Sequence, residues 1–209
     1  MPGLELLIPF LLATAVFAYM PGPALLYTAA QTMAGGRRAG LMAALGLHLG
    51  GYVHVLAAAL GLSAILDYVP ELYAALKLCG AAYLIWLGIA MLWQEPAPKM
   101  PFEQPRKTTR RALIDSFFVE MLNPKTALFF IAFLPQFADP SAGVPIGLQL
   151  LVLGIVVNLA FSSADLITVF LTSLIVRNVQ RSNRGIRIIR KMGGLVLVGL
   201  GLRLAFARD

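Results

Sequence analysis

Four ionisable side chains stand inside long apolar stretches of this sequence, and they are the residues best placed to do chemistry. Asp165, Glu120 and His54 each have an apolar residue on both sides, and Lys125 stands between Pro124 and Thr126. A carboxylate at the centre of a bilayer costs roughly 2.5–3.5 kcal/mol on insertion scales, so it needs a partner or a task. Because carboxyl and imidazole groups can carry protons, we interpret Asp165, Glu120 and His54 as candidates for proton coupling.

Each of these residues also has a structural explanation. Asp165 could form a permanent ion pair with Lys125, and His54 could be a satisfied interfacial histidine in a stripe of small residues that packs against another helix. Lys125 needs an anion at this depth, which could be Asp165, Glu120 or a substrate. The residues alone leave these alternatives open.

Two proline motifs should interrupt helices at the same depth. Proline lacks a backbone donor and clashes with the preceding turn, so it frees carbonyl and amide groups. In a membrane such groups are tolerated only where protein or a watery cavity satisfies them. They could then bind the carboxylate and ammonium of a zwitterionic solute, although a plain proline kink is the alternative. The predicted substrate-binding residues at the breaks are Pro21, Gly22, Pro23, Asn123, Pro124 and Lys125.

A polar stripe accompanies Asp165. Asn158, Ser162, Asp165, Val169 and Thr172 recur at the spacing of one helix face. A single wet face in an otherwise apolar segment is typical of a cavity wall, so we expect Asn158 and Ser162 to line a cavity.

The elements that must position these residues are membrane helices. Hydrophobic residues make up 59% of the 209 residues and charged residues only 13%, about half the usual charge of a soluble domain. Between Glu5 and Arg37 lie 31 uncharged residues in a row, more than the roughly 20 that span a bilayer. The sequence predicts an all-α polytopic protein with helices at Leu6–Ala34, Ala39–Leu66, Leu72–Trp93, Ala112–Ala138, Ile146–Val176 and Met192–Ala207.

Charge in the connecting loops predicts the orientation. The first, third and fifth loops hold 13 basic residues, whereas the second and fourth hold none. Cytoplasmic loops are enriched in Lys and Arg, so we expect these three loops inside and both termini outside. The net charge of +7 therefore indicates a membrane protein rather than a nucleic-acid-binding one.

The sequence contains a pattern that repeats in inverted orientation. Lys77, Gly80 and Gly88 have the same spacing as Arg190, Gly193 and Gly201, and each set opens a helix. Three predicted spans separate them, so the two copies would enter from opposite sides. A 3+3 inverted repeat is common in secondary transporters, where the site lies at the midplane. We expect one transmembrane domain over 1–209, with repeat one at about 1–94, a cytoplasmic loop at about 95–111 and repeat two at about 112–209.

Several classes of protein and site do not fit. A single cysteine, Cys79, supports neither an internal disulfide nor a multi-cysteine metal site. The first charge is acidic, so we expect no cleavable signal peptide. No motif for a metal or a cofactor is present, and the histidines lack the spacing of a zinc hydrolase.

These motifs resemble those of the LysE/RhtB family of amino-acid exporters. The resemblance rests on Met20-Pro21-Gly22-Pro23 and Gly80-Ala81-Ala82-Tyr83-Leu84 in the first half. In the second half it rests on the run from Leu122 to Phe130, on Phe133-Leu134-Pro135-Gln136-Phe137 and on the run from Gly193 to Leu204. The resemblance implies six helices in a 3+3 arrangement and export of amino acids from the bacterial cytoplasm against inward proton flow. Pro21, Gly22, Pro23, Asn123, Pro124 and Lys125 are the positions that match the family motifs.

We therefore predict a secondary exporter of small neutral L-amino acids, of the threonine, homoserine or leucine type, coupled to protons. The predicted location is the bacterial inner membrane, the expected partners are the substrate, protons and lipid but no nucleic acid, and a homodimer is compatible with the sequence. A channel or facilitator for a small polar solute is the alternative, and an intramembrane enzyme is a weaker one.

Overall fold

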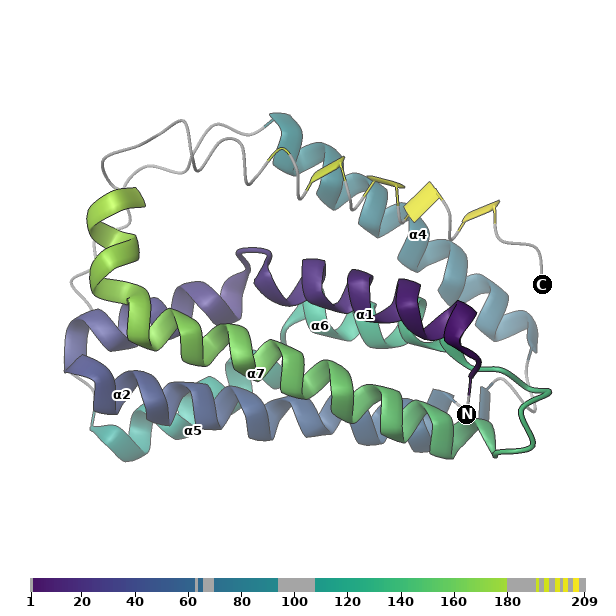
Figure 1. Ribbon diagram of the computed structural model, residues 1–209, viewed down its shortest axis with the longest axis horizontal. Helices are drawn as coiled ribbons and strands as arrows, with labels where there is room; N and C mark the ends of the chain where they lie inside the picture. The colour runs from purple at the N-terminus through teal and green to yellow at the C-terminus, as the bar shows by residue number, and fades with distance from the viewer. Residues whose placement is uncertain are drawn as a thin grey trace.

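Helices account for all regular secondary structure in the described part of the chain, as the composition predicts (Figure 1). The computed structural model describes residues 2–62, 64–65, 70–93 and 108–179, together with 191, 194–195, 198–199, 201–202 and 205–206. Most of the predicted third loop and half of the helix predicted over Met192–Ala207 lie outside the described residues.

The first predicted helix is broken where the sequence predicts. Helix α1 covers Leu4–Tyr19, and helix α2 begins at Pro23 and extends to Leu56. Pro21 cannot donate to the α1 ladder, Gly22 is extended as the N-cap of α2, and Pro23 suits the first helical turn because its fixed φ is helical. The local sequence therefore creates one helix end and one helix start within four residues.

The first two spans meet at a bend rather than in the loop expected between residues 34 and 39. Only Gly36 is non-helical within α2, with φ 76° and ψ −176°. A glycine adopts positive φ without strain, so the chain reverses at this one residue. Across the bend a Cβ added to Gly40 would lie 2.0 Å from the Thr32 hydroxyl oxygen, which shows how tightly the two arms meet. Beyond Leu56 the second arm continues as a π-helical turn, η1, over Ala57–Leu62.

The predicted fourth helix is broken in the same manner. Helix α5 covers Thr109–Met121, and a new helical run starts with α6 at Pro124–Leu128. The Asn123 side chain caps α6 by accepting a hydrogen bond from the Lys125 amide at 3.1 Å. The run then continues as a π-helical turn, η2 at Phe129–Phe133, and a 3₁₀ turn, η3 at Leu134–Phe137, neither of which was predicted.

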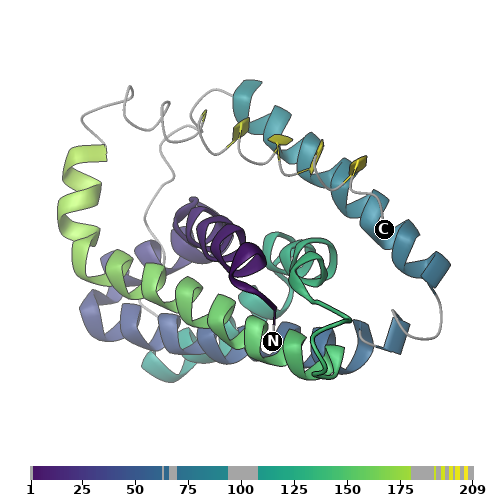
Figure 2. The ribbon, with the colours of Figure 1, turned by 45° about the vertical axis from the view of Figure 1, so that its right-hand side comes forward.

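Aromatic side chains hold the two broken helices together. Phe10 packs on Phe137 with ring centroids 5.3 Å apart, and Phe17 packs on Phe129 at 4.8 Å. The order of these pairs makes α1 antiparallel to the segment from α6 to η3, and Figure 2 shows the two side by side. As a consequence, both breaks lie at the same level of the bundle.

Helix α2 connects the remaining helices. It packs against α5 and against α7, which covers Ile146–Val179. Glycines permit close approach to α5: a Cβ on Gly46 would lie 2.2 Å from the Leu113 carbonyl oxygen, and one on Gly50 would lie 2.5 Å from that of Phe117.

Helix α4, at Pro70–Trp93, pairs with the final segment. A Cβ on Gly88 would lie 2.6 Å from the Gly194 carbonyl oxygen, and one on Gly201 would lie 2.9 Å from that of Ala81. The two segments are therefore antiparallel and nearly in backbone contact, as the ribbon also shows (Figure 1).

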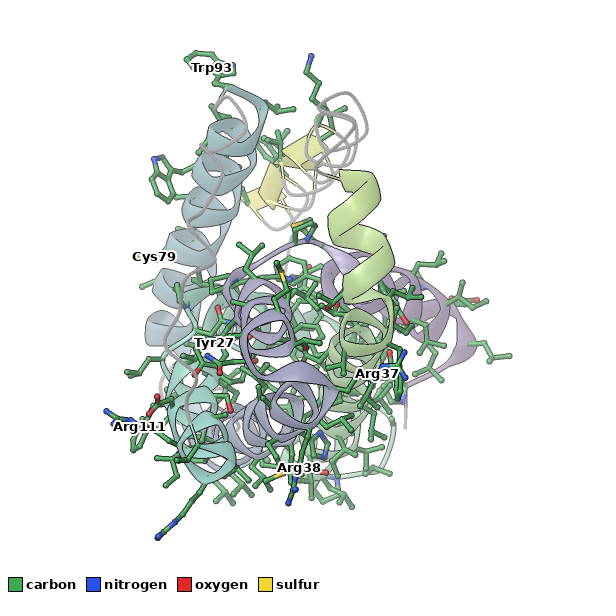
Figure 3. All side chains as sticks on the ribbon, turned by 90° about the vertical axis from the view of Figure 1, so that its left-hand side faces the viewer. Tyr27, Arg37, Arg38, Cys79, Trp93 and Arg111 are labelled. Atoms are coloured by element: carbon green, nitrogen blue, oxygen red, sulfur yellow. The ribbon has the colours of Figure 1, made fainter. Side chains whose placement is uncertain are left out.

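Three arginines from two parts of the chain lie at one end of the bundle. Arg37, Arg38 and Arg111 lie there, although the chain separates the first two from the third by more than seventy residues (Figure 3). Among the described residues, three segments are long and apolar enough to cross a membrane: Pro23–Leu62, Arg110–Phe137 and Ile146–Thr172. The first has 40 residues, or about 60 Å at 1.5 Å per residue, twice a bilayer core, which the reversal at Gly36 explains.

Candidate functional site

The two helix breaks open onto one pocket. It is bounded by the ends of α1 and α2, by α5 and α6 on either side of Asn123, and by the middle of α7. The lining residues are Ala18, Gly22, Ala24, Leu25, Glu120, Asn123, Lys125, Thr126, Phe161 and Asp165. The pocket is narrow, with a volume of about 20 Å³, on the order of a single water molecule.

Lys125 closes the end of α1. Its ammonium donates hydrogen bonds to the carbonyl oxygens of Phe17 at 2.6 Å and Met20 at 2.9 Å. The Phe17 carbonyl would normally accept from the amide four residues on, but that residue is Pro21, which has none. A cation at the C-terminal end of a helix also complements the helix dipole. Lys125 thus satisfies backbone groups that the proline break has exposed.

The path of the Lys125 side chain depends on Gly22. A Cβ on Gly22 would lie 2.9 Å from Lys125 Cδ, closer than real Cβ atoms come to a neighbour. The ammonium also lies 5.2 Å from the ring centroid of Phe17 and 5.6 Å from that of Phe161, within the range of cation–π attraction. Glycine at position 22 therefore makes room for the lysine, and the rings stabilise its charge.

Glu120 is held by the residues of its own break. One carboxylate oxygen accepts from the Asn123 amide group at 2.9 Å and the other from the Thr126 hydroxyl at 2.6 Å. His54 on α2 donates from Nε2 to the Glu120 backbone carbonyl at 2.9 Å. Both side chains are buried, and the histidine contacts the peptide of Glu120 rather than its carboxylate.

Asp165 has weaker partners. Its side chain is 4% exposed, and one oxygen accepts a hydrogen bond of 3.3 Å from the Thr28 hydroxyl. The hydrogen bonds of Lys125 go to carbonyl oxygens, so the permanent Asp165–Lys125 pair considered from the sequence is not formed as a hydrogen-bonded contact. Of the two carboxyl groups in this pocket, Asp165 accepts fewer hydrogen bonds than Glu120.

The charges of the pocket do not balance when all three groups are ionised. Glu120, Asp165 and Lys125 then carry a net charge of −1 in a largely buried site. An isolated charge is costly to bury, so one added proton on a carboxyl group neutralises the site.

The polar stripe of α7 contacts α2 instead of lining this pocket. The Asn158 side chain donates to the His48 carbonyl at 3.1 Å, and Ser162 lies 2.6 Å from His48 Nδ1. A Cβ on Gly51 would lie 2.1 Å from Asn158 Oδ1, so this face is tightly packed. Of the stripe, Asp165 alone belongs to the lining described above.

The structure thus brings together most of the residues predicted from the sequence. Gly22, Asn123, Lys125, Glu120 and Asp165 meet at one pocket, and His54 lies one hydrogen bond behind it. The prolines set the breaks, at the N-terminus of α2 and of α6. Within the described ranges, no group of three or more His, Cys, Asp or Glu side chains could hold a metal ion.

Sequence reasoning missed two buried hydroxyl groups. Thr28 donates to Asp165, and Thr126 donates to Glu120. Both residues are almost fully buried, at 0% and 1% exposure. Their positions could have indicated them, because each follows the proline of a helix break. Thr28 comes five residues after Pro23, and Thr126 comes two residues after Pro124.

The similarity to known proteins extends over nearly the whole chain. Residues 15–208 match the family model described as LysE type translocator. An uncharacterized membrane protein of Pseudomonas aeruginosa is 32% identical over 95% of this chain and 94% of its own length. Two proteins named leucine efflux protein are also similar. The one from Enterobacter is 29% identical over 89% of this chain and 88% of its own length, and the one from Klebsiella pneumoniae is 26% identical over 94% and 92%. No solved structure matches.

Proposed function

Because the chain belongs to the LysE type translocator family, we propose that it exports small neutral amino acids from the bacterial cytoplasm by proton antiport. Membership of this family makes it a membrane transporter and not an enzyme. The observation that carries this proposal is the meeting of two helix breaks, one lysine and two carboxyl groups at one buried pocket. Helix ends at a shared depth are the usual binding site of secondary transporters.

The groups that line the pocket suit a zwitterion with an apolar side chain, for which the narrow pocket must widen during the transport cycle. Lys125 can pair with the substrate's carboxylate, and the helix ends offer further backbone donors and acceptors. Ala18, Leu25 and Phe161 supply an apolar wall. Both carboxylate oxygens of Glu120 already accept hydrogen bonds. We assign Asp165 to the proton, so neither carboxylate serves a cationic side chain. The similarity to leucine efflux proteins supports a substrate of the leucine type.

Proton coupling is assigned to Asp165. It is buried and weakly hydrogen-bonded, so a change in its charge disturbs fewer partners than a change at Glu120 would. In the proposed cycle, Asp165 takes a proton from outside, and its release to the cytoplasm is linked to the outward step of the substrate.

We also propose six spans in two inverted repeats, with the basic end in the cytoplasm. A shift of 113 residues relates Ala81 to Gly194 and Gly88 to Gly201. The contact between Gly88 and Gly194 then maps onto the contact between Gly201 and Ala81, as a two-fold axis in the membrane plane requires. The matching breaks at Gly22-Pro23 and Asn123-Pro124 support the same arrangement.

Efflux from proteoliposomes tests the function. Vesicles loaded with radiolabelled L-leucine and carrying the purified protein should release it in a saturable manner, and an inward proton gradient should drive leucine against its own gradient. A screen of cells with and without the protein for growth inhibition by each amino acid and its toxic analogues identifies the substrate. Non-saturable release that never becomes concentrative would identify a channel and overturn the antiporter.

A further inference from the structure

The ammonium of Lys125 occupies a site built for an ammonium group. Its two acceptors, the carbonyl oxygens of Phe17 and Met20, lie at the C-terminal end of α1, where the helix dipole is negative. The Phe17 carbonyl has no helical partner because Pro21 follows at the fourth position. Any primary ammonium that reaches this point meets the same two oxygens.

We infer that these two carbonyl oxygens form the subsite for the substrate's α-ammonium group, and that Lys125 fills this subsite until the substrate arrives. The inference rests on the proposed function. A lysine ammonium and an α-ammonium are equivalent donors, each with three N–H groups and one positive charge. Until the substrate binds, the Lys125 ammonium occupies the place of the substrate's α-ammonium.

An exchange of partners follows from this assignment. The substrate's carboxylate attracts the Lys125 ammonium into a charge-assisted pair, and the α-ammonium takes the oxygens that the lysine leaves. The lysine can move because its head group sits on a flexible four-carbon stem. The number of bonds to the Phe17 and Met20 carbonyls is conserved, and the net charge of the pocket is unchanged because the substrate is a zwitterion.

The exchange requires both charged groups of an amino acid. An amine without a carboxylate cannot attract Lys125 out of the subsite. The lysine ammonium therefore continues to occupy the subsite, and the amine binds only weakly. A hydroxy acid can attract Lys125, but its hydroxyl has a single O–H donor and no positive charge, so at least one of the two carbonyl oxygens is left without a donor in a buried site, which is costly. Amino acids are thus selected over both partial analogues.

The test removes the resident ammonium. Lys125→Met should bind L-leucine at least about 30-fold more weakly than the wild type, because the substrate's carboxylate loses its partner. The same variant should bind 3-methylbutylamine, which is leucine without its carboxylate, at least about tenfold more tightly than the wild type, because the subsite is vacant. Calorimetry on the purified protein in detergent measures both constants. Lys191→Met is the matched control, since Lys191 is exposed, and should change neither.

A second variant separates the subsite from the general effect of removing a positive charge. Lys125→Met with Pro21→Ala has the same charge as Lys125→Met, but the new amide at position 21 can satisfy the Phe17 carbonyl. Its affinity for 3-methylbutylamine should fall back towards that of the wild type. Equal amine affinity in the two variants would attribute the gain to charge alone and overturn the subsite.

Gly22→Ala decides the question if the lysine variants do not fold. The new Cβ displaces the Lys125 side chain while keeping its charge, so amine binding should rise; unchanged amine binding would overturn the inference. Gly61→Ala, where nothing lies within 4 Å, is its control. A wild type that exports no amino acid would overturn the proposed function itself. Wild-type leucine export with unaltered analogue binding in the variants would overturn this inference alone.

Discussion

At the scale of single residues, the two carboxyl groups of the pocket differ in how firmly they are held. Glu120 accepts hydrogen bonds at both oxygens from its own break, whereas Asp165 accepts one long hydrogen bond from Thr28. A firmly bonded carboxylate organises the break around it. A weakly bonded one suits the proton-carrying role that we propose for Asp165.

The first prediction concerns Asp165→Asn. The amide keeps the size of the side chain but cannot take up or release a proton, so proton-driven leucine efflux should fall to the level of protein-free liposomes. Exchange of internal for external leucine needs no net proton movement and should persist. Both are measured in proteoliposomes with and without an imposed pH gradient.

Asp139→Asn is the matched control for this variant. Hydrogen bonds from the Ser141 hydroxyl at 2.6 Å and amide at 2.8 Å lower the pKa of Asp139, which lies between two membrane segments. Asp139 therefore remains ionised throughout the neutral range and takes up no proton there. Full gradient-driven efflux in Asp165→Asn, or an equal loss in Asp139→Asn, would contradict the assignment of the proton to Asp165.

Sequence reasoning located Asp165 and Lys125 but not their partners. Depth in an apolar stretch is a property of the local sequence, and it marked both residues. The partners of Lys125 are carbonyl oxygens more than a hundred residues away, and the tertiary packing of α1 against η2, η3 and α7 brings them together. A threonine such as Thr28 was inconspicuous because its hydroxyl usually bonds to its own helix.

At the scale of elements, the break between α1 and α2 should be necessary for transport. Replacing Pro21 and Pro23 together by alanine restores two amide donors and allows a continuous helix, which removes the exposed carbonyl of Phe17. The variant should remain folded but lose leucine affinity and efflux. Pro9→Ala, also within α1, leaves the break intact and should transport as the wild type does. Unaltered transport in the double variant would show that the break is not part of the site.

Close packing of α2 on α5 gives a prediction about stability. In Gly50→Ala the new Cβ would lie 2.5 Å from the Phe117 carbonyl oxygen and 3.0 Å from Glu120 Cβ, so the helices must separate. Overpacking of this kind costs about 1–3 kcal/mol. The midpoint of thermal unfolding in detergent should fall, whereas Gly61→Ala should leave it unchanged. Equal midpoints would mean that α2 and α5 can shift apart without cost.

The elements that the sequence did not predict have tertiary causes. Gly35, Gly36 and Gly40 could each have made the first turn, and only the contact between the two arms of α2 selects Gly36. The π-helical turn over Phe129–Phe133 contains no proline or glycine that would mark it, whereas Pro135 stands in the first turn of the 3₁₀ segment that follows. Both turns lie where Phe129, Phe133 and Phe137 pack against each other and against α1.

At the scale of the whole molecule, the end that carries Arg37, Arg38 and Arg111 should face the cytoplasm. Single cysteines in a Cys79→Ala background test this with a membrane-impermeant maleimide. Ser141→Cys, at the opposite end, should be labelled on spheroplasts. Arg38→Cys should be labelled only after permeabilisation. The reverse pattern would invert the topology and with it the direction of transport.

Lys125 competes with the ammonium group of an entering solute for the carbonyl oxygens of Phe17 and Met20, and it cannot diffuse away. A group held by a short flexible chain beside its own binding site has an effective concentration on the order of millimolar or higher. An amine without a carboxylate must outcompete it, so we expect such amines to stay out of the pocket at ordinary cytoplasmic concentrations. The tether would thus let the protein export amino acids from a cytoplasm that also contains simple amines.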